Sequence, residues 1–161
     1  MAANPLDDLD LAILSHLQQD GRKPFTDIAR ALDVSVGTVR NRVGKMLEDE
    51  TVWIYARINP PQLGLNASAN IHVSVSPSNL IESVANVVKD FPEVSYVAML
   101  SGEYDLEIDV MCRDTAHLTK FIQQDLHPVP GVVKTVTSII LRSYLYRQPD
   151  LSVLMTEQDD K

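Results

Sequence analysis

Two alternating apolar runs on either side of a short glycine turn constrain the fold of this chain more than any other feature of its sequence. Apolar residues occupy alternate positions around Ser101-Gly102-Glu103, namely Val97 and Met99 before it and Leu106, Ile108 and Val110 after it. A period of two on both sides of a turn is typical of two half-buried antiparallel strands. We therefore predict a hairpin over residues 97–110 at the middle of a sheet, with Gly102 supplying a positive φ.

The second half of the chain switches regularly between strand-like and helix-like periods. Strands are predicted over residues 69–75, 94–100, 104–112 and 132–145, with one helix after Pro77-Ser78 and another after Asp114 or Thr115. This order of strand, helix, strand, strand, helix, strand is the ferredoxin-like split βαβ arrangement. A further short edge strand is predicted within residues 148–155.

Three amphipathic segments at the start of the chain predict three helices. The first covers residues 8–19, the second begins at Pro24, and the third covers residues 36–48 with Ser35 as its N-cap. A short helix, a tight turn and a capped helix form the helix-turn-helix that enters the major groove of DNA. Residues 52–58 alternate and predict a short strand or wing after the third helix.

Polar and basic side chains lie opposite the apolar stripe of the predicted third helix. We expect the early residues to approach base edges and the basic residues to contact phosphates. The predicted DNA-binding residues are Ser35, Val36, Gly37, Thr38, Arg40, Asn41, Arg42 and Lys45. A three-helix core with a solvated basic face would give the same pattern, so this alternative stays open from the residues alone.

Composition and breaks in the pattern define an α+β protein with two domains. We predict a winged helix-turn-helix domain over residues 1–58, a linker over residues 59–66 around Pro60-Pro61, a ferredoxin-like domain over residues 67–155, and a tail over residues 156–161. The formal net charge is −8, of which residues 58–161 contribute −6. An acidic chain with one local basic face does not suit indiscriminate coating of nucleic acid.

The remaining composition excludes several other classes of protein. No apolar run approaches the roughly 18 residues of a membrane span, and the first residues lack the pattern of a secretory signal, so we expect a cytoplasmic protein. The single Cys112 cannot form an internal disulfide and is predicted to be a buried thiol.

With both halves considered, the chain resembles the leucine-responsive and asparagine-responsive (Lrp/AsnC) family of transcription regulators. The residues that carry the resemblance are Leu9-Asp10, Ile13-Leu14 and residues 17–22 in the first helix, Ile28-Ala29, Val34-Ser35 and Arg42-Val43 in the helix-turn-helix, and residues 102–105 with 130–132 in the second half. The resemblance implies binding to double-stranded DNA, a homodimer formed by packing sheets face to face, and assembly of dimers into an octamer.

The resemblance also implies a small effector, typically an amino acid, bound between dimers. The matching effector-binding positions are Leu100, Gly102, Tyr104, Asp105, Thr135, Thr137 and Ser138. A carboxylate such as Asp105 can pair with the ammonium of an amino acid, whereas turn N–H groups and threonine hydroxyls can bind its carboxylate. The alternative is that Asp105 only stabilises its own turn. The chain departs from the family pattern at Thr51, where a glycine is usual, and in a wing that is about two residues short.

Two other functions share this scaffold. A sirohaem-decarboxylase-like enzyme would use histidine and arginine around a tetrapyrrole, but the four histidines, His16, His72, His117 and His127, are scattered and have no metal-ligand spacing. A ligand sensor with a vestigial helix-turn-helix is the third possibility. The sequence favours a regulator without catalytic residues, cofactor or metal.

Overall fold

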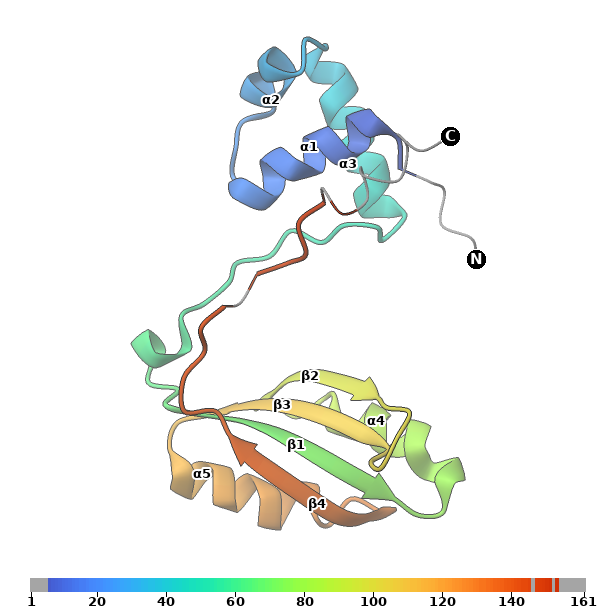
Figure 1. Cartoon of the computed structure of the whole chain (residues 1–161), viewed down its shortest axis with the longest axis vertical. Coiled ribbons are helices and arrows are strands. Elements are labelled where there is room, and N and C mark those ends of the chain that lie inside the picture. The colour runs from blue at the N-terminus through green and yellow to red at the C-terminus, as the bar shows by residue number, and fades with distance from the viewer. Residues whose placement is uncertain (1–5, 146, 152, 154–161) are drawn as a thin grey trace. The chain divides into compact units, whose positions relative to one another are not determined.

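The computed structural model describes residues 6–145, 147–151 and 153, which form two compact units (Figure 1). Of the described residues, those from 6 to 56 and those from 145 onward form a helical unit, and Arg57–Tyr144 form a sheet unit. The prediction instead carried the sheet domain to residue 155. The described residues after Tyr144 belong to the helical unit, so the chain leaves that unit and later returns to it.

Helices α1 (Asp8–Gln19), α2 (Phe25–Ala31) and α3 (Val36–Glu48) form the helical unit. The predicted bounds of the first and third helices are confirmed. Asp7 caps α1 by accepting the N–H of Asp10, and the Asp10 side chain accepts the N–H of Asp7 in return. The buried core contains Ile13, Leu14, Leu17, Ile28, Ala29, Val39, Val43 and Met46.

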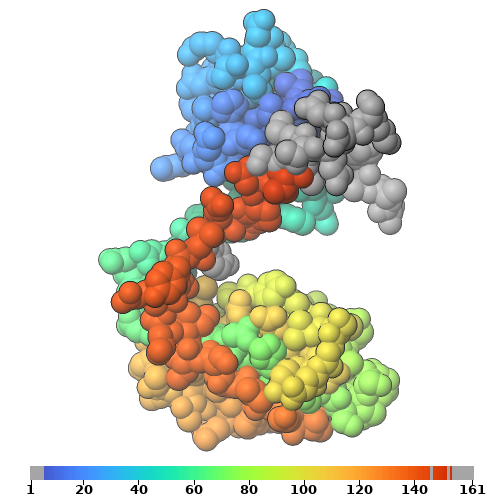
Figure 2. All heavy atoms as spheres, in the orientation of Figure 1, coloured from blue at the N-terminus to red at the C-terminus, as the bar shows by residue number. Residues whose placement is uncertain are grey.

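The C-terminal segment completes this unit from far along the sequence. The Gln18 side-chain amide donates to the Pro149 carbonyl oxygen at 3.2 Å, and Leu151 packs against the helical core. Figure 2 shows the C-terminal segment, in red, against the blue helical unit. Residues 147–151 contain no strand, so the edge strand predicted for residues 148–155 is wrong there. Residues 152, 154 and 155 lie outside the described residues.

Residues 52–58 do not form the predicted strand or wing. Their alternation does not point toward a core, because the side chains of Trp53 and Tyr55 are 69% and 68% exposed. A strand also requires a neighbouring backbone to pair with, and this segment has none in the sheet. The short 3₁₀ helix η1 (Pro60–Leu63) follows.

The sheet unit consists of four antiparallel strands in the order β2-β3-β1-β4. Its elements are β1 (Ala67–Val75), η2 (Ser78–Leu80), α4 (Ile81–Val88), β2 (Val94–Met99), β3 (Leu106–Cys112), α5 (Thr115–Lys120), the π-helix η3 (Phe121–Leu126) and β4 (Val132–Ile139). The ferredoxin-like order is therefore confirmed. Only half of the hairpin is central as predicted, because β3 is an inner strand and β2 is an edge strand.

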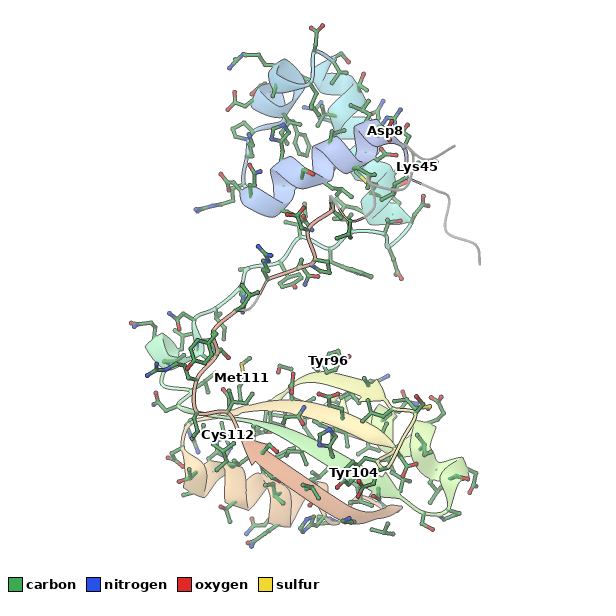
Figure 3. All side chains as sticks on the ribbon, in the orientation of Figure 1. Asp8, Lys45, Tyr96, Tyr104, Met111 and Cys112 are labelled. Carbon is green, nitrogen blue, oxygen red and sulfur yellow. The ribbon has the colours of Figure 1, made fainter. Side chains whose placement is uncertain are left out.

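One face of the sheet is buried beneath α4, α5 and η3 (Figure 1). Alternate residues of β1 and β3 are buried, and the other residues of both strands are half-exposed on the opposite face. Met111 and Cys112 illustrate this alternation (Figure 3). The predicted burial of Cys112 is confirmed, and burial raises the pKa of its thiol. No helix among the described residues combines the length and hydropathy needed to span a bilayer.

Strand β4 ends at Ile139, six residues before the predicted end at Leu145. Its partner β1 begins at Ala67, and the pairing runs out where Ala69 faces Ile139 and Ile140 donates its N–H to Ser68 O at 2.8 Å. Beyond that point none of the described strands continues the pairing. The apolar run therefore continues in the sequence after the ladder has ended, which leaves Leu141 95% exposed.

Glycine at position 131, and not at position 102, has the constrained backbone. Gly131 has a φ of +103°, whereas Gly102 does not lie in the positive-φ region that the hairpin turn was expected to require. A Cβ atom added at Gly131 would lie 3.1 Å from Leu80, but one added at Gly102 would meet no atom within 4 Å.

Gly131→Ala is expected to lower the free energy of unfolding by at least about 1–2 kcal/mol, because the backbone and the Leu80 side chain both oppose a side chain there. Gly102→Ala is the matched control and should change it by less than about 0.5 kcal/mol or stabilise the protein slightly. Urea denaturation of both variants checks this. Equal losses of unfolding free energy in the two variants would contradict the conclusion that Gly131, and not Gly102, has the constrained backbone.

Candidate functional site

The N-terminus of α3 is fixed by two hydroxyl side chains. Ser35 Oγ accepts the N–H of Thr38 at 2.9 Å and lies 2.8 Å from Thr38 Oγ1. This is an N-cap in which the third residue of the helix joins the cap. The predicted contacts of Ser35 and Thr38 with DNA therefore involve groups that already hold the helix start in place. Val36 is partly buried and packs against the helical core.

The exposed face of α3 carries the polar residues predicted to bind DNA. Val39, Val43 and Met46 are buried on the opposite side of the helix, whereas Gly37, Arg40, Asn41 and Lys45 are exposed. In the part of the chain that is described, the side chains of Arg40, Asn41 and Lys45 form no hydrogen bond or ion pair. Their charges and donors are thus available to an external ligand, and Lys45 is visible on the helix in Figure 3.

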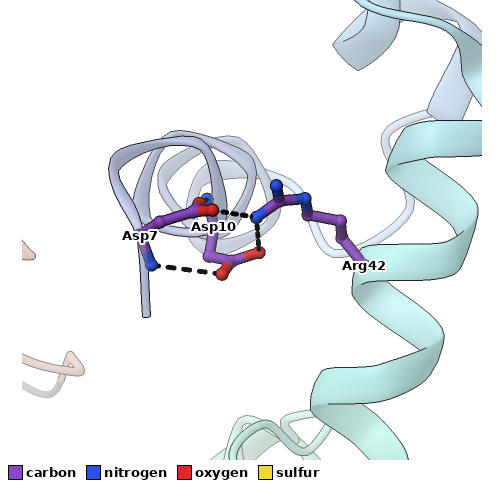
Figure 4. A network of polar contacts seen from close by, with 3 residues as sticks. All are labelled: Asp7, Asp10 and Arg42. Carbon is purple, nitrogen blue, oxygen red and sulfur yellow. Dashed lines mark hydrogen bonds and ion pairs between the residues drawn. The ribbon is translucent and has the colours of Figure 1, made fainter. Parts of the chain in front are cut away.

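Arg42 is engaged within the helical unit. Its Nη1 atom contacts Asp7 Oδ2 and lies 3.1 Å from Asp10 Oδ1, which joins α3 to the first turn of α1 (Figure 4). The hydrogen bond from Arg42 lowers the pKa of Asp7 below its ordinary value of 3.8, and the same contacts raise the pKa of Arg42. We name Asp7, Asp10 and Arg42 the clamp. The structure thus gives Arg42 an intramolecular ion pair, and its phosphate contact stays a prediction.

In the sheet unit, Asp105 holds the hairpin to the end of β1. Its Oδ2 atom accepts the N–H of Val75 at 2.7 Å, and its own N–H donates to Val73 O at 2.9 Å. Leu100 donates its N–H to Asp105 O at 2.9 Å, which closes the turn. These contacts match the alternative in which Asp105 stabilises local structure. A role in binding an ammonium would use the second carboxylate oxygen or the remaining lone pair of Oδ2.

Tyr104 contacts side chains from two other strands, which the sequence alone did not predict. Its ring stacks on His72 of β1 with centroids 5.0 Å apart, and Lys134 Nζ of β4 lies 5.3 Å from the Tyr104 centroid. Lys134 also forms an exposed ion pair with Glu103 at 3.9 Å. Strand parity could have placed His72 and Lys134 on one face, but the strand order was needed to bring them beside the hairpin.

The three predicted effector residues of β4 do not lie on the same face of the sheet. Thr135 and Thr137 pair with Val73 and Ile71 of β1, whose side chains are buried on the helix-covered side of the sheet. Ser138 pairs with Asn70, whose side chain lies on the open side. Thr135 Oγ1 also lies 2.9 Å from His127 Nε2. The seven predicted positions therefore do not form a single pocket within one chain.

Two acidic residues of β3, Glu107 and Asp109, are bridged by an amide. Asn70 Nδ2 donates to Glu107 Oε1 at 2.5 Å and to Asp109 Oδ1 at 3.0 Å. One amide nitrogen carries two hydrogens, so it can satisfy both carboxylates. The open face of β1 and β3 is thus acidic, and hydrogen bonds from Asn70 hold its two carboxylates in place.

The histidines also occupy separate local sites. His16 Nδ1 lies 2.9 Å from Lys23 Nζ, and His117 Nε2 lies 3.0 Å from Glu93 Oε1. Among the described residues, no group of three or more histidine, cysteine or acidic side chains could hold a metal ion. A shallow hollow of about 330 Å³ between α4 and β2 contains none of the predicted effector residues; it is lined by Ala85, Asn86, Lys89, Val94, Ser95, Tyr96 and Val97.

A capped helix with a free polar face in one unit and a ferredoxin-like sheet in the other is the arrangement expected of a two-domain DNA-binding transcription regulator. Residues 6–47 match the model of the AsnC-type helix-turn-helix domain, and residues 68–150 match that of the Lrp/AsnC ligand-binding domain. The chain belongs to the Lrp/AsnC family of transcription regulators.

Relatives and solved structures agree with this assignment. An uncharacterised HTH-type transcriptional regulator of Pyrococcus furiosus is 37% identical over 84% of this chain and 91% of its own. An HTH-type transcriptional regulator of Methanocaldococcus jannaschii is 34% identical over 86% of this chain and 94% of its own. A transcriptional regulator from Neisseria meningitidis in complex with L-Met superposes with a TM-score of 0.83 and 26% identity, covering 93% of this chain and 99% of that one.

Asp105→Ala is expected to lower the free energy of unfolding by about 1–3 kcal/mol, because it leaves the buried Val75 N–H without an acceptor. Asp105→Asn keeps an acceptor oxygen, so its free energy of unfolding should fall by clearly less. Chemical denaturation of both variants measures the difference. If Asp105→Ala is as stable as the wild type, the hydrogen bond to Val75 is not the structural contact that the geometry indicates.

Proposed function

We propose that the regulator reads its operator with the exposed face of α3 and responds to a small effector, an amino acid or a related metabolite, bound by the sheet unit. The observation that carries the DNA half is the row of Arg40, Asn41 and Lys45, whose side chains have no partner in the described chain while Ser35 and the clamp hold the helix in place. Arg40 and Lys45 would contact phosphates, and Asn41 would contact base edges beside Gly37.

The proposal for the effector draws on the hairpin and on the relatives. The Neisseria relative binds L-Met, and this chain has the same fold with a ligand-binding domain. An amino acid effector would meet the hairpin at Leu100, Gly102 and Tyr104, where Lys134 offers a cation for its carboxylate. Thr135 and Thr137 lie on one face of the sheet and Ser138 on the other, so the three could all contact effectors only if these bind between subunits.

Assembly into homodimers, and of dimers into an octamer, is part of the same proposal. Two-fold symmetric dimers would present two α3 helices to two half-sites of a palindromic operator. An effector held between subunits would favour one spacing of these helices and so couple ligand and operator affinity. The partly exposed sheet face of β1 and β3, with Asn70 bridging Glu107 and Asp109, would face another subunit. We place this regulator in the cytoplasm.

Arg40→Ala and Lys45→Ala should each weaken DNA binding and flatten the plot of log affinity against log salt by about 0.9, because each loses one phosphate contact. Lys120→Ala removes the same charge from α5 in the sheet unit and serves as the control, with an unchanged slope. Fluorescence anisotropy with a duplex selected by the wild type from a random-sequence library measures both quantities. If the wild type selects no duplex at low salt, the chain is a sensor with a vestigial helix-turn-helix.

A thermal-shift screen of the twenty amino acids is expected to find a ligand that stabilises the wild type by about 2.7 kcal/mol at a hundredfold excess over its dissociation constant. Tyr104→Ala should reduce that shift, and Asp105→Asn tests the carboxylate without removing the hydrogen-bond acceptor for Val75. Tyr96→Ala, which removes an exposed tyrosine from β2, is the matched control. A ligand that stabilises the wild type and Tyr104→Ala equally does not bind at the hairpin.

A further inference from the structure

We propose that Arg42 positions the recognition helix α3 and does not contact DNA itself. The clamp would set the rotation of α3 relative to α1, and with it the direction in which Arg40, Asn41 and Lys45 point. This inference depends on the proposed recognition face of α3. It assigns to Arg42, Asp7 and Asp10 a shared role in DNA affinity that follows from their geometry.

The clamp supplies the directional contact between two helices that otherwise meet through apolar side chains. Val39 and Val43 of α3 share a core with Ile13 and Leu14 of α1, and such contacts tolerate small rotations and slides. Charge-assisted hydrogen bonds are short and directional, so they restrict those movements. Arg42 is 33% exposed and Asp10 only 15%, which limits screening of the bond between them by solvent.

The local charge around Arg42 opposes a phosphate contact. One guanidinium is matched by two carboxylates, so the clamp carries a net charge of −1 and would repel a DNA phosphate at the same place. Arg42 also projects from α3 toward α1 (Figure 4), whereas Arg40 and Lys45 are exposed. Basic residues of the same helix therefore divide into one that orients it and two that face outward.

The test uses neutral, nearly isosteric replacements on α1, which leave α3 unchanged. Asp10→Asn should lower affinity for the selected duplex about three- to tenfold, the range expected when one net hydrogen bond no longer holds the binding orientation. The slope of log affinity against log salt should not change. Asp8→Asn removes the same charge from the neighbouring exposed position and is the matched control, with affinity equal to that of the wild type or slightly higher.

The sign of the effect separates positioning from simple electrostatics. Removing a carboxylate near DNA should tighten binding if charge alone matters. If Arg42 is a phosphate contact that Asp10 restrains, Asp10→Asn should release it, raise affinity and steepen the salt slope by about 0.9. Tighter binding therefore overturns the proposal, and so does affinity that is indistinguishable from that of Asp8→Asn.

Arg42→Met examines the same clamp from the α3 side. Its affinity should fall by a similar factor with the salt slope retained, whereas a slope flatter by about 0.9 would identify a phosphate contact and refute the proposal. The double variant Arg42→Met/Asp10→Asn should bind no more weakly than the weaker single variant, because both remove one interaction. Additive losses would contradict a shared role.

Two controls keep the outcome independent of folding and of the proposed function. Circular dichroism confirms that each variant is folded at the temperature of the assay, and Asp7→Asn, which can still cap α1, replaces Asp10→Asn if the latter melts too early. If Arg40→Ala and Lys45→Ala leave the salt slope unchanged, the proposed recognition face is wrong. If they flatten it while Asp10→Asn does not weaken binding, only the positioning role fails.

Discussion

The register of β1 between β3 and β4 determines what each face of the sheet unit can do. Ile71 and Val73 are buried under the helices, so a slip of one residue would expose them and bury Asn70 and His72 instead. Burial of apolar area thus selects one pairing. The polar contacts follow from it, because that pairing sets Asn70 beside Asp109 and His72 opposite Glu107. The hairpin is tied to the same strand through the backbone of Val73 and Val75.

Basic residues of α3 show how tertiary position assigns roles to chemically similar side chains. Arg40 and Arg42 are two residues apart, so the helical period turns them to different sides of α3. Arg42 meets two carboxylates of α1, and its positive charge is matched inside the unit. Arg40 meets none. A cluster of basic residues in the sequence can therefore combine side chains that are paired within the domain with side chains that are unpaired.

Helix bounds were predictable because their signals are local. Asp7 and Ser35 cap the first and third helices with contacts only three residues away, and the predicted ranges 8–19 and 36–48 agree with the structure. The succession of strands and helices along the chain was predictable from the change between a period of two and a helical period, but the order of the strands in the sheet was not. Features that depend on a distant partner were not: β4 ends where β1 stops pairing, and residues 52–58 alternate without a core to face.

The site residues likewise divide into those whose position follows from local sequence and those whose contacts depend on a distant part of the chain. The exposed positions of α3 follow from helical period, but the engagement of Arg42 required knowledge of where α1 lies. Asp105 was identified as important, and its acceptor role toward Val75 depends on the end of a strand thirty residues away in the sequence. Gly102 was expected to need a positive φ and does not have one, whereas Gly131 has a φ of +103° beside the Leu80 side chain.

The return of the chain to the helical unit has a consequence for synthesis. Gln18 and Pro149 are 131 residues apart, and everything in the sheet unit is translated between them. A ribosome therefore completes α1, α2 and α3 well before it makes the segment that packs beside them. Any association of the three helices during synthesis therefore takes place without Leu151, and the sheet unit is made before Leu151 can pack against them. Only a chain translated past Leu151 carries the finished helical unit.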